Sequence, residues 1–274
     1  MTTAFAGETT SATTQAATLL GVASFGVRIG VQISNPKMVD KVVHFLPPGW
    51  NEVKDTEYRR IYSIIQKPTE DGVELYSDGH FIASRDDTDS LLTAFQSHLQ
   101  LYVAEMATNR LFVHAGCVAW CGKAVMLPGS SFSGKTMLVA ALVAAGAVYY
   151  SDEYATLDSE GLVHPYGRAL SIREPNGKRR RCTAEELGGV SGVEPLRVGA
   201  ILFSSYRCGA EWNPRALSTG EGLIELLCNT VPARSRPQSA LAILHKSVAS
   251  AIILKGERGE AETTALAILN ENRL

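Results

Sequence analysis

Several features that mark other protein classes are missing from this sequence of 274 residues. The five cysteines form no C-x-x-C pair and are irregularly spaced, which argues against a disulfide framework or a zinc finger. The formal net charge is only -2, so overall charge gives no reason to expect a nucleic acid or membrane partner. The longest uncharged apolar run, Met137 to Tyr150, has 14 residues and is too short to span a bilayer.

The amino-terminal segment also lacks a secretory signal pattern. Residues 1–20 are rich in Thr, Ala and Ser, with no basic region ahead of an apolar core, and we expect a disordered tail. Cys117 and Cys121 stand four apart in one strand-like run, which leaves zinc binding open as an alternative. Buried reduced thiols are the favoured interpretation, and they favour a cytoplasmic protein.

One stretch carries a chemical motif. The pattern G-x-x-x-x-G-K-[ST] is matched at every fixed position by Gly129, Ser130, Ser131, Phe132, Ser133, Gly134, Lys135 and Thr136. An apolar run of strand length, residues 123–127, precedes it, and an apolar helical stretch, residues 136–145, follows and ends at Gly146. A strand, a glycine loop and a helix amino terminus together cradle phosphate oxygens, so we predict nucleotide binding over the alternative of an incidental turn.

The chain before the motif predicts a separate α+β portion. We expect a disordered tail over residues 1–20, an N-terminal domain over 21–109 and the nucleotide core over 110–274. Alternating or helical spacing in the N-terminal domain predicts a strand over Leu20–Ile33, a helix over Pro36–Leu46, hairpin strands over Arg60–Ile65, Gly72–Tyr76 and His80–Ser84, and a helix over Asp89–Asn109.

Two acidic residues follow the motif at the end of an apolar strand. The run from Gly146 ends in Asp152 and Glu153, where a strand's carboxyl end can lie beside bound phosphates. Carboxylates at that place hold Mg²⁺ and orient a nucleophile. Because side chains alternate along a strand, the two acids face one metal only if the strand ends there. A solvated strand end is the alternative.

A histidine lies on the other side of the motif. Residues 111–120 and 123–127 form a predicted hairpin with a turn at Cys121-Gly122, and His114 is on its first strand. A lone strand histidine is more often structural, and a catalytic or orienting role is the alternative.

These pieces together resemble a known family. Leu111-Phe-Val-His114-Ala-Gly116, the glycine loop, and Gly146-Ala-Val-Tyr-Tyr-Ser-Asp152-Glu153 are similar, in order and spacing, to the core of HPr serine kinase/phosphorylase. That core has the P-loop fold shared with phosphoenolpyruvate carboxykinase. Residues 164–174 and 202–210 look more like the HPr-kinase-related proteins of peptide tailoring, including lasso peptide kinases.

The resemblance implies roles for the nucleotide-binding residues. Lys135 and the loop amides would grip the β- and γ-phosphates of ATP, and Thr136 would reach Mg²⁺. Phe132 stands where the family has a small residue, so it either narrows the nucleotide site or packs in the interior.

The resemblance also implies roles around the transferred group. Asp152 would accept the proton of a substrate hydroxyl, and Glu153 would help to hold the metal directly or through water. His114 would sit beside the base, and Arg173 would neutralise charge on the transferred group. The longer signature of the HPr enzyme is only faintly matched by residues 171–174, so HPr itself is not expected as the substrate.

The remaining segments are read from local pattern. Lys178 to Arg181 form a basic cluster after the turn signal Pro175-Asn176-Gly177, which predicts an exposed loop. Such a loop is either merely solvated, covers the phosphates, or recognises an acidic peptide. Helices are predicted over residues 221–228, 238–249 and 260–270, with a strand over 250–254.

The sequence therefore predicts an α/β fold with a mixed sheet in a P-loop core of HPr kinase or carboxykinase type, preceded by a small α+β portion. The expected activity is ATP- and Mg²⁺-dependent phosphorylation of a serine hydroxyl on a peptide or small protein, with a homo-oligomer as one state of assembly. An ATP-binding regulatory protein without turnover and a small-molecule kinase are the alternatives.

Overall fold

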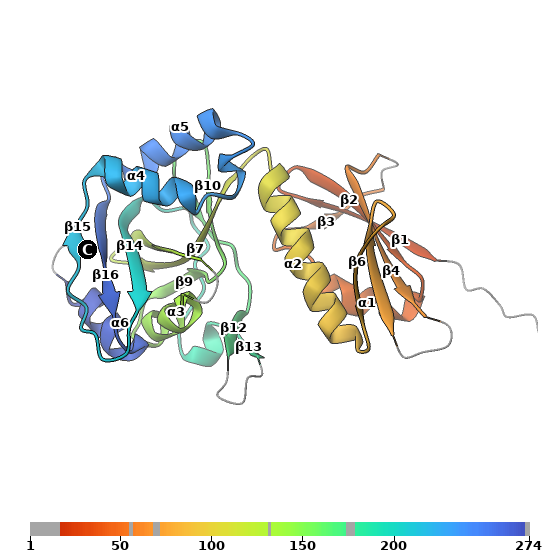
Figure 1. Ribbon diagram of the computed structural model, residues 1–274, viewed down its shortest axis with the longest axis horizontal. Helices are drawn as coiled ribbons and strands as arrows, with labels where there is room; N and C mark the ends of the chain where they lie inside the picture. The colour runs from red at the N-terminus through yellow and green to blue at the C-terminus, as the bar shows by residue number, and fades with distance from the viewer. Residues whose placement is uncertain (1–16, 55–56, 68–71, 131–132, 174–178, 272–274) are drawn as a thin grey trace, which may run out of the picture. The chain divides into compact units, whose positions relative to one another are not determined.

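The computed structural model describes residues 17–54, 57–67, 72–130, 133–173 and 179–271, and it is a mixed α/β protein (Figure 1). The chain divides into two compact units, one of residues 1–24 and 28–100 and the other of residues 25–27 and 101–274. The division at residue 100 falls within helix α2 (Thr88–Met106). Within the described ranges, no helix is both long enough and apolar enough to cross a membrane.

The first unit is a six-stranded sheet with α2 as its long helix. Its strands lie in the order β3-β1-β2-β4-β5-β6, and Tyr62 of β4 meets Phe95 of α2 edge to face. The elements are β1 (Thr18–Ser24), β2 (Val27–Ile33), the 3₁₀ helix η1 (Pro36–Met38), α1 (Val39–Val43), β3 (Asn51–Glu52), β4 (Arg60–Gln66), β5 (Val73–Ser77) and β6 (His80–Arg85).

Two predictions for this unit are wrong in part. The single strand predicted over Leu20–Ile33 is two strands, because Phe25 and Gly26 adopt positive φ angles of 49° and 80° and form a two-residue turn. The tail predicted over residues 1–20 ends earlier, since β1 begins at Thr18, and residues 1–16 lie outside the described residues. The predicted hairpins of β4, β5 and β6 are confirmed as antiparallel pairs.

The second unit is built on an eight-stranded mixed sheet. Seven strands follow the order β11-β10-β7-β8-β14-β16-β15, and β9 pairs with β7. Strands β8, β14 and β16 run parallel, and β7 is antiparallel to β8. The strands are β7 (Leu111–Trp120), β8 (Lys123–Pro128), β9 (Val148–Ser151), β10 (Tyr154–Leu157), β11 (Val163–His164), β14 (Val198–Tyr206), β15 (Arg215–Ala216) and β16 (Ile252–Arg258).

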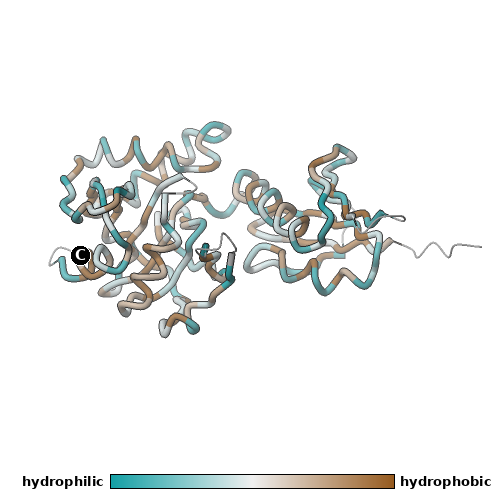
Figure 2. The backbone as a smooth tube through the Cα atoms, turned by 60° about the horizontal axis from the view of Figure 1, so that its bottom comes forward, coloured by the Kyte–Doolittle hydropathy of each residue, from teal (hydrophilic) through white to brown (hydrophobic). Residues whose placement is uncertain are grey.

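Helices cover both faces of this sheet, and hydrophobic segments gather in its interior (Figure 2). Val113, Ala115 and Cys117 pack in one core cluster with α4 and α5, whereas Val118 packs in another with α3 and α6. The helices are α3 (Lys135–Ala144), the 3₁₀ helices η2 (Glu185–Leu187) and η3 (Val231–Ala233), α4 (Thr219–Cys228), α5 (Pro237–Val248) and α6 (Ala261–Leu269).

The prediction of an exposed loop for the basic residues is wrong, because they form a strand. Strands β12 (Leu170–Arg173) and β13 (Arg179–Cys182) form a separate antiparallel ribbon, in which Arg173 lies opposite Arg179 and Ile172 opposite Arg180. The basic run is therefore a strand, because Ile172 and Cys182 supply buried or packed positions that a charge count does not reveal. Lys178 lies outside the described residues.

The cysteines also differ in part from prediction. All five are free, but only Cys117 and Cys182 are buried, while Cys121, Cys208 and Cys228 are exposed. Cys117 lies within β7, whereas Cys121 begins the turn to β8 with a φ of 48°. The two cysteines that stand in one strand-like run of the sequence therefore belong to different local structures.

Candidate functional site

The glycine loop runs from the end of β8 to the start of α3. Gly134 precedes the helix with a φ of 80°, in the left-handed region that glycine enters without a Cβ penalty. The helix begins at Lys135, so its first backbone N–H groups have no partner within the helix. This is the geometry that presents amide groups to an anion. Ser131 and Phe132, two of the predicted loop residues, lie outside the described residues.

The amine of Lys135 lies over the first half of the loop. Its Nζ donates hydrogen bonds to the carbonyl oxygens of Gly129 and Ser130, both at 2.7 Å. Burial lowers the pKa of Lys135, although the carboxylates of Glu153 and Asp152 oppose that shift. The hydroxyl of Ser133 is buried and has no hydrogen-bond partner among the described residues.

Arg258, at the end of β16, holds the second half of the loop. Arg258 is 2% exposed, and its Nη2 donates to the carbonyl oxygens of Ser133 at 3.2 Å and Gly134 at 2.9 Å. The ring of Tyr206 lies 5.6 Å from its Cζ, and burial lowers the pKa of Arg258. No sequence motif marks this position, and the strand predicted over residues 250–254 ends before it.

Strand β7 joins the loop to the acidic pair. On one edge, Ala115 pairs with Pro128, and Gly129 donates its N–H to the carbonyl oxygen of His114 at 3.3 Å. On the other edge, Ala115 donates its N–H to the carbonyl oxygen of Glu153 at 3.2 Å. The glycine loop and the acidic residues are therefore brought to adjacent positions by backbone pairing with a single strand.

Asp152 lies in the gap between β9 and β10, which both pair with β7, and its side chain contacts Thr136 at the start of α3. It is 5% exposed, and its Oδ2 accepts from Thr136 Oγ1 at 3.3 Å and from the Ser171 N–H at 3.4 Å. Burial raises the pKa of Asp152, and the Glu153 charge adds to the rise, while the positive charge of Arg168 opposes it. A buried carboxyl with a raised pKa is suited to accepting a proton.

Tyr149, in β9, contacts the carboxylate of Asp152. Its hydroxyl lies 2.6 Å from the carbonyl oxygen of Arg168 and 3.3 Å from Asp152 Oδ1. A phenol has one hydrogen to donate, and the shorter contact takes it. Asp152 therefore gains little hydrogen-bond stabilisation of its charge from this neighbour, in agreement with its raised pKa.

Glu153 turns to the opposite side, toward His114. His114 Nε2 lies 3.6 Å from Glu153 Oε1, and both side chains are partly exposed. Burial alone would raise the pKa of Glu153, but contact with His114 and the charges of Arg168 and Lys135 together lower it below its ordinary value of 4.5. The two neighbouring acids thus have opposite shifts, one toward the neutral form and one toward the ionised form.

Arg168 is a second residue that sequence reasoning missed. It lies in the irregular segment between β11 and β12, and its positive charge acts on Asp152, Glu153 and Tyr149. Arg173, the arginine predicted for this task, is exposed at the end of β12. From the same strand, the backbone N–H of Ser171 donates to Asp152 Oδ2 at 3.4 Å.

The oxygen ligands at the loop fit a magnesium ion. Among the described residues, no group of three or more His, Cys, Asp or Glu side chains is arranged to hold a metal. Magnesium, however, is commonly bound by one or two carboxylates, water and substrate phosphates. Thr136 Oγ1 and Asp152 Oδ2 are neighbouring oxygens of that kind, and Glu153 comes from the next position in the chain.

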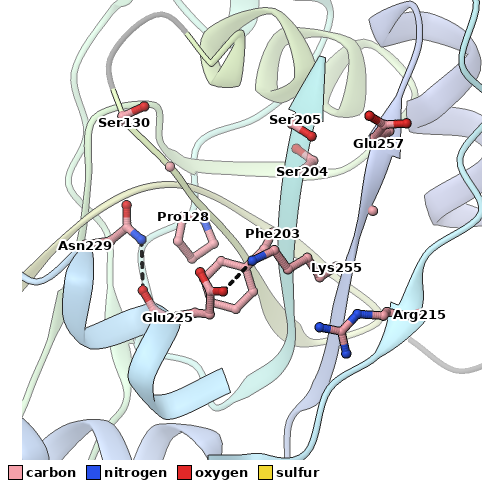
Figure 3. A pocket seen from close by; sticks show the side chains of 12 residues that line it. Pro128, Ser130, Phe203, Ser204, Ser205, Arg215, Glu225, Asn229, Lys255 and Glu257 are labelled. Atoms are coloured by element: carbon pink, nitrogen blue, oxygen red, sulfur yellow. Dashed lines mark hydrogen bonds and ion pairs between the residues drawn. The ribbon is translucent and has the colours of Figure 1, made fainter. Parts of the chain in front are cut away.

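A pocket of about 540 Å³ opens beside the loop (Figure 3). It lies at the carboxyl ends of the three parallel strands β8, β14 and β16 and is closed on one side by α4. Its wall includes Gly129 and Ser130 of the loop, and Lys255 of β16 forms an ion pair with Glu225 of α4. In doubly wound α/β sheets, ligands bind at this end of the strands.

Neither a protein-family model nor a curated protein matched the sequence. The interpretation of the site therefore depends on its own geometry.

Proposed function

We propose that this protein is an ATP- and Mg²⁺-dependent kinase that phosphorylates a serine hydroxyl of a peptide or small protein. The observation that supports it most directly is the 3.3 Å contact between Thr136 Oγ1 and Asp152 Oδ2. It joins the residue that follows the lysine of the phosphate-loop motif to a buried carboxyl whose pKa is raised. A phosphoryl-transfer site needs these two groups at one place.

Phosphate binding rests on the loop and its two cations. Lys135 Nζ already lies within the loop, where the β- and γ-phosphates of ATP would replace carbonyl oxygens as its partners. The amide groups at the start of α3 and the unpartnered hydroxyl of Ser133 offer further donors. Arg258 donates to the carbonyl oxygens of Ser133 and Gly134. The N–H groups on the other side of these two peptide bonds would then be directed at the phosphates.

Magnesium would be held by Thr136, by water and by phosphate oxygens, with Asp152 or Glu153 completing the ligand set. Bound there, the ion would neutralise charge on the β- and γ-phosphates.

Asp152 would act as the general base. It accepts the proton of the acceptor hydroxyl as the oxygen forms a bond to the γ-phosphorus, and the bond to the β,γ-bridging oxygen breaks to release ADP. Burial raises the pKa of Asp152 and makes its carboxylate a stronger base than an exposed aspartate, while the positive charge of Arg168 favours the ionised form. His114 positions the neighbouring Glu153 rather than Asp152 itself.

The acceptor class is proposed from the resemblance to HPr kinase-related peptide-tailoring proteins, on the residues quoted above. A small-molecule kinase would use the same loop and base and would differ only in the acceptor.

The test is transfer of label from [γ-³²P]ATP to serine-containing peptides by the purified full-length chain. Asp152→Asn keeps the shape of the side chain and removes the base, so transfer should fall by about 100-fold or more while ATP still binds. Asp158→Asn is a matched control, since Asp158 pairs with His164 at 2.8 Å and has no contact with the loop among those described. Undiminished transfer in Asp152→Asn would contradict the mechanism. Tight ATP binding without transfer or hydrolysis in the unchanged protein would favour a regulatory role.

A further inference from the structure

The pocket beside the loop is separate from the groups proposed for phosphoryl transfer. The loop leaves β8, and the sheet order places β7 and β9 on one side of β8 and β14 and β16 on the other. Asp152 follows β9, whereas the pocket lies at the ends of β14 and β16. Asp152 and most of the pocket wall are thus on opposite sides of β8. Asn229, at the edge of the wall, accepts a hydrogen bond from the His114 N–H of β7 at 2.7 Å.

The direction of phosphoryl transfer indicates which part of the nucleotide would lie at the pocket. The acceptor oxygen, the γ-phosphorus and the leaving oxygen must lie roughly in line. If Asp152 receives the acceptor's proton, the acceptor approaches from the β9 side, and the β- and α-phosphates extend the opposite way. That direction leads over Gly129 and Ser130, which belong to both the loop and the pocket wall.

The wall has the chemistry that a sugar needs. Ser205, at the end of β14 and on the same strand face as Phe203, and Ser130 of the loop bring hydroxyl groups to the pocket (Figure 3). Lys255 and Glu225 form an ion pair across it, and both side chains are partly exposed. Hydroxyl and carboxylate groups are donors and acceptors for ribose hydroxyls.

We infer that this pocket holds the ribose and base of the nucleotide, an assignment that rests on the proposed kinase function. A volume of about 540 Å³ lies within the range of pockets that enclose a small organic ligand. The acceptor would then bind on the other side of the loop, next to Asp152 and the β12–β13 ribbon.

The experiment compares two ligands that share phosphates but differ in the nucleoside. Inorganic tripolyphosphate needs only the loop, whereas ATP needs the loop and the pocket. Ser205→Trp would place an indole in the pocket from an exposed position, and Ser205→Leu is a smaller second variant at the same position. Ser239→Trp, an exposed serine of α5 outside the pocket, is the matched control.

Binding is measured by calorimetry in the presence of Mg²⁺ on full-length protein whose folding is checked by circular dichroism. The pocket variants should weaken ATP binding by about tenfold or more and leave tripolyphosphate binding within about twofold. The control should change neither. Unchanged ATP affinity with a raised KM for the peptide acceptor would overturn the inference and assign the pocket to the acceptor. If the unchanged protein binds neither ATP nor tripolyphosphate, the proposed function itself fails.

Discussion

Arg258 donates a hydrogen bond from Nη2 to the carbonyl oxygen of Gly134 at 2.9 Å, across 124 positions of the chain. The N–H and C=O of a trans peptide point in opposite directions. Holding this carbonyl on one side therefore directs the next N–H, that of Lys135, to the side where a phosphate would lie. The arginine supports the loop without occupying it.

Replacing Arg258 should therefore weaken phosphate binding as a whole. Arg258→Met removes charge-assisted hydrogen bonds worth about 1.5–3 kcal/mol each, and we expect ATP and tripolyphosphate affinity to fall together by about tenfold or more. Arg258→Lys keeps one charged donor and should recover part of the loss. Calorimetry with both ligands measures this, with Arg234→Met, at an exposed arginine of the same unit, as control. A loss confined to ATP would show that Arg258 serves the nucleoside instead.

Gly134 should tolerate no side chain. Its φ of 80° is unfavourable for other residues, and a Cβ there would collide with Arg258 Nη2. Gly188, with a φ of 79° and open space around it, is a control for backbone strain alone. Gly188→Ala should cost about 1–2 kcal/mol of unfolding free energy, and Gly134→Ala should cost more and abolish ATP binding. Equal losses in urea unfolding, with ATP binding retained, would contradict the clamp.

Asp152 should destabilise the ligand-free protein at neutral pH. Its folded-state pKa is above the ordinary value of 3.8, so between these values the native protein binds more protons than the unfolded chain, and stability falls as pH rises. Asp152→Asn should therefore raise the thermal midpoint at pH 7, with the gain vanishing below pH 3.8.

The opposite sign is expected at Asp158. Burial raises the pKa of Asp158, but the hydrogen bond to His164 and backbone N–H groups lower it below 3.8 overall. Its stabilisation is present above pH 3.8 and is lost as pH falls, so Asp158→Asn should lower the midpoint at pH 7. Midpoints that move the same way in both variants would contradict the raised pKa of Asp152.

Arg168 should set the pH at which transfer becomes efficient. Its charge opposes the burial that raises the pKa of Asp152. In Arg168→Met the base should ionise only at higher pH, so the acid limb of the kcat/KM profile should move upward. Arg110→Met is the control, because Arg110 lies just before β7 and contacts His164 at 3.2 Å. An unmoved acid limb with reduced kcat would indicate that Arg168 contacts substrate instead.

Local sequence patterns predicted much of the second unit but not its distant partnerships. The hairpin of β7 and β8, helix α3 and the strand end at Asp152 are all encoded within a few residues, and each is confirmed as structure. Arg258 reaches the loop only because β16 pairs in parallel with β14, which pairs with β8. No periodicity in one segment reports such pairing. The charged run of β13 likewise reads as a loop until its register with β12 is known.

Strand β7 sets the distance between the two halves of the site, the glycine loop and the acidic residues. The loop is attached to one of its edges and the acidic residues to the other, so two inter-strand steps, together about 10 Å, separate the strands that carry them. Main-chain hydrogen bonds, and not side-chain contacts, set this spacing. Side-chain substitutions that change acceptor specificity or the charge around the carboxylates can therefore accumulate without changing the distance between the glycine loop and the acidic residues.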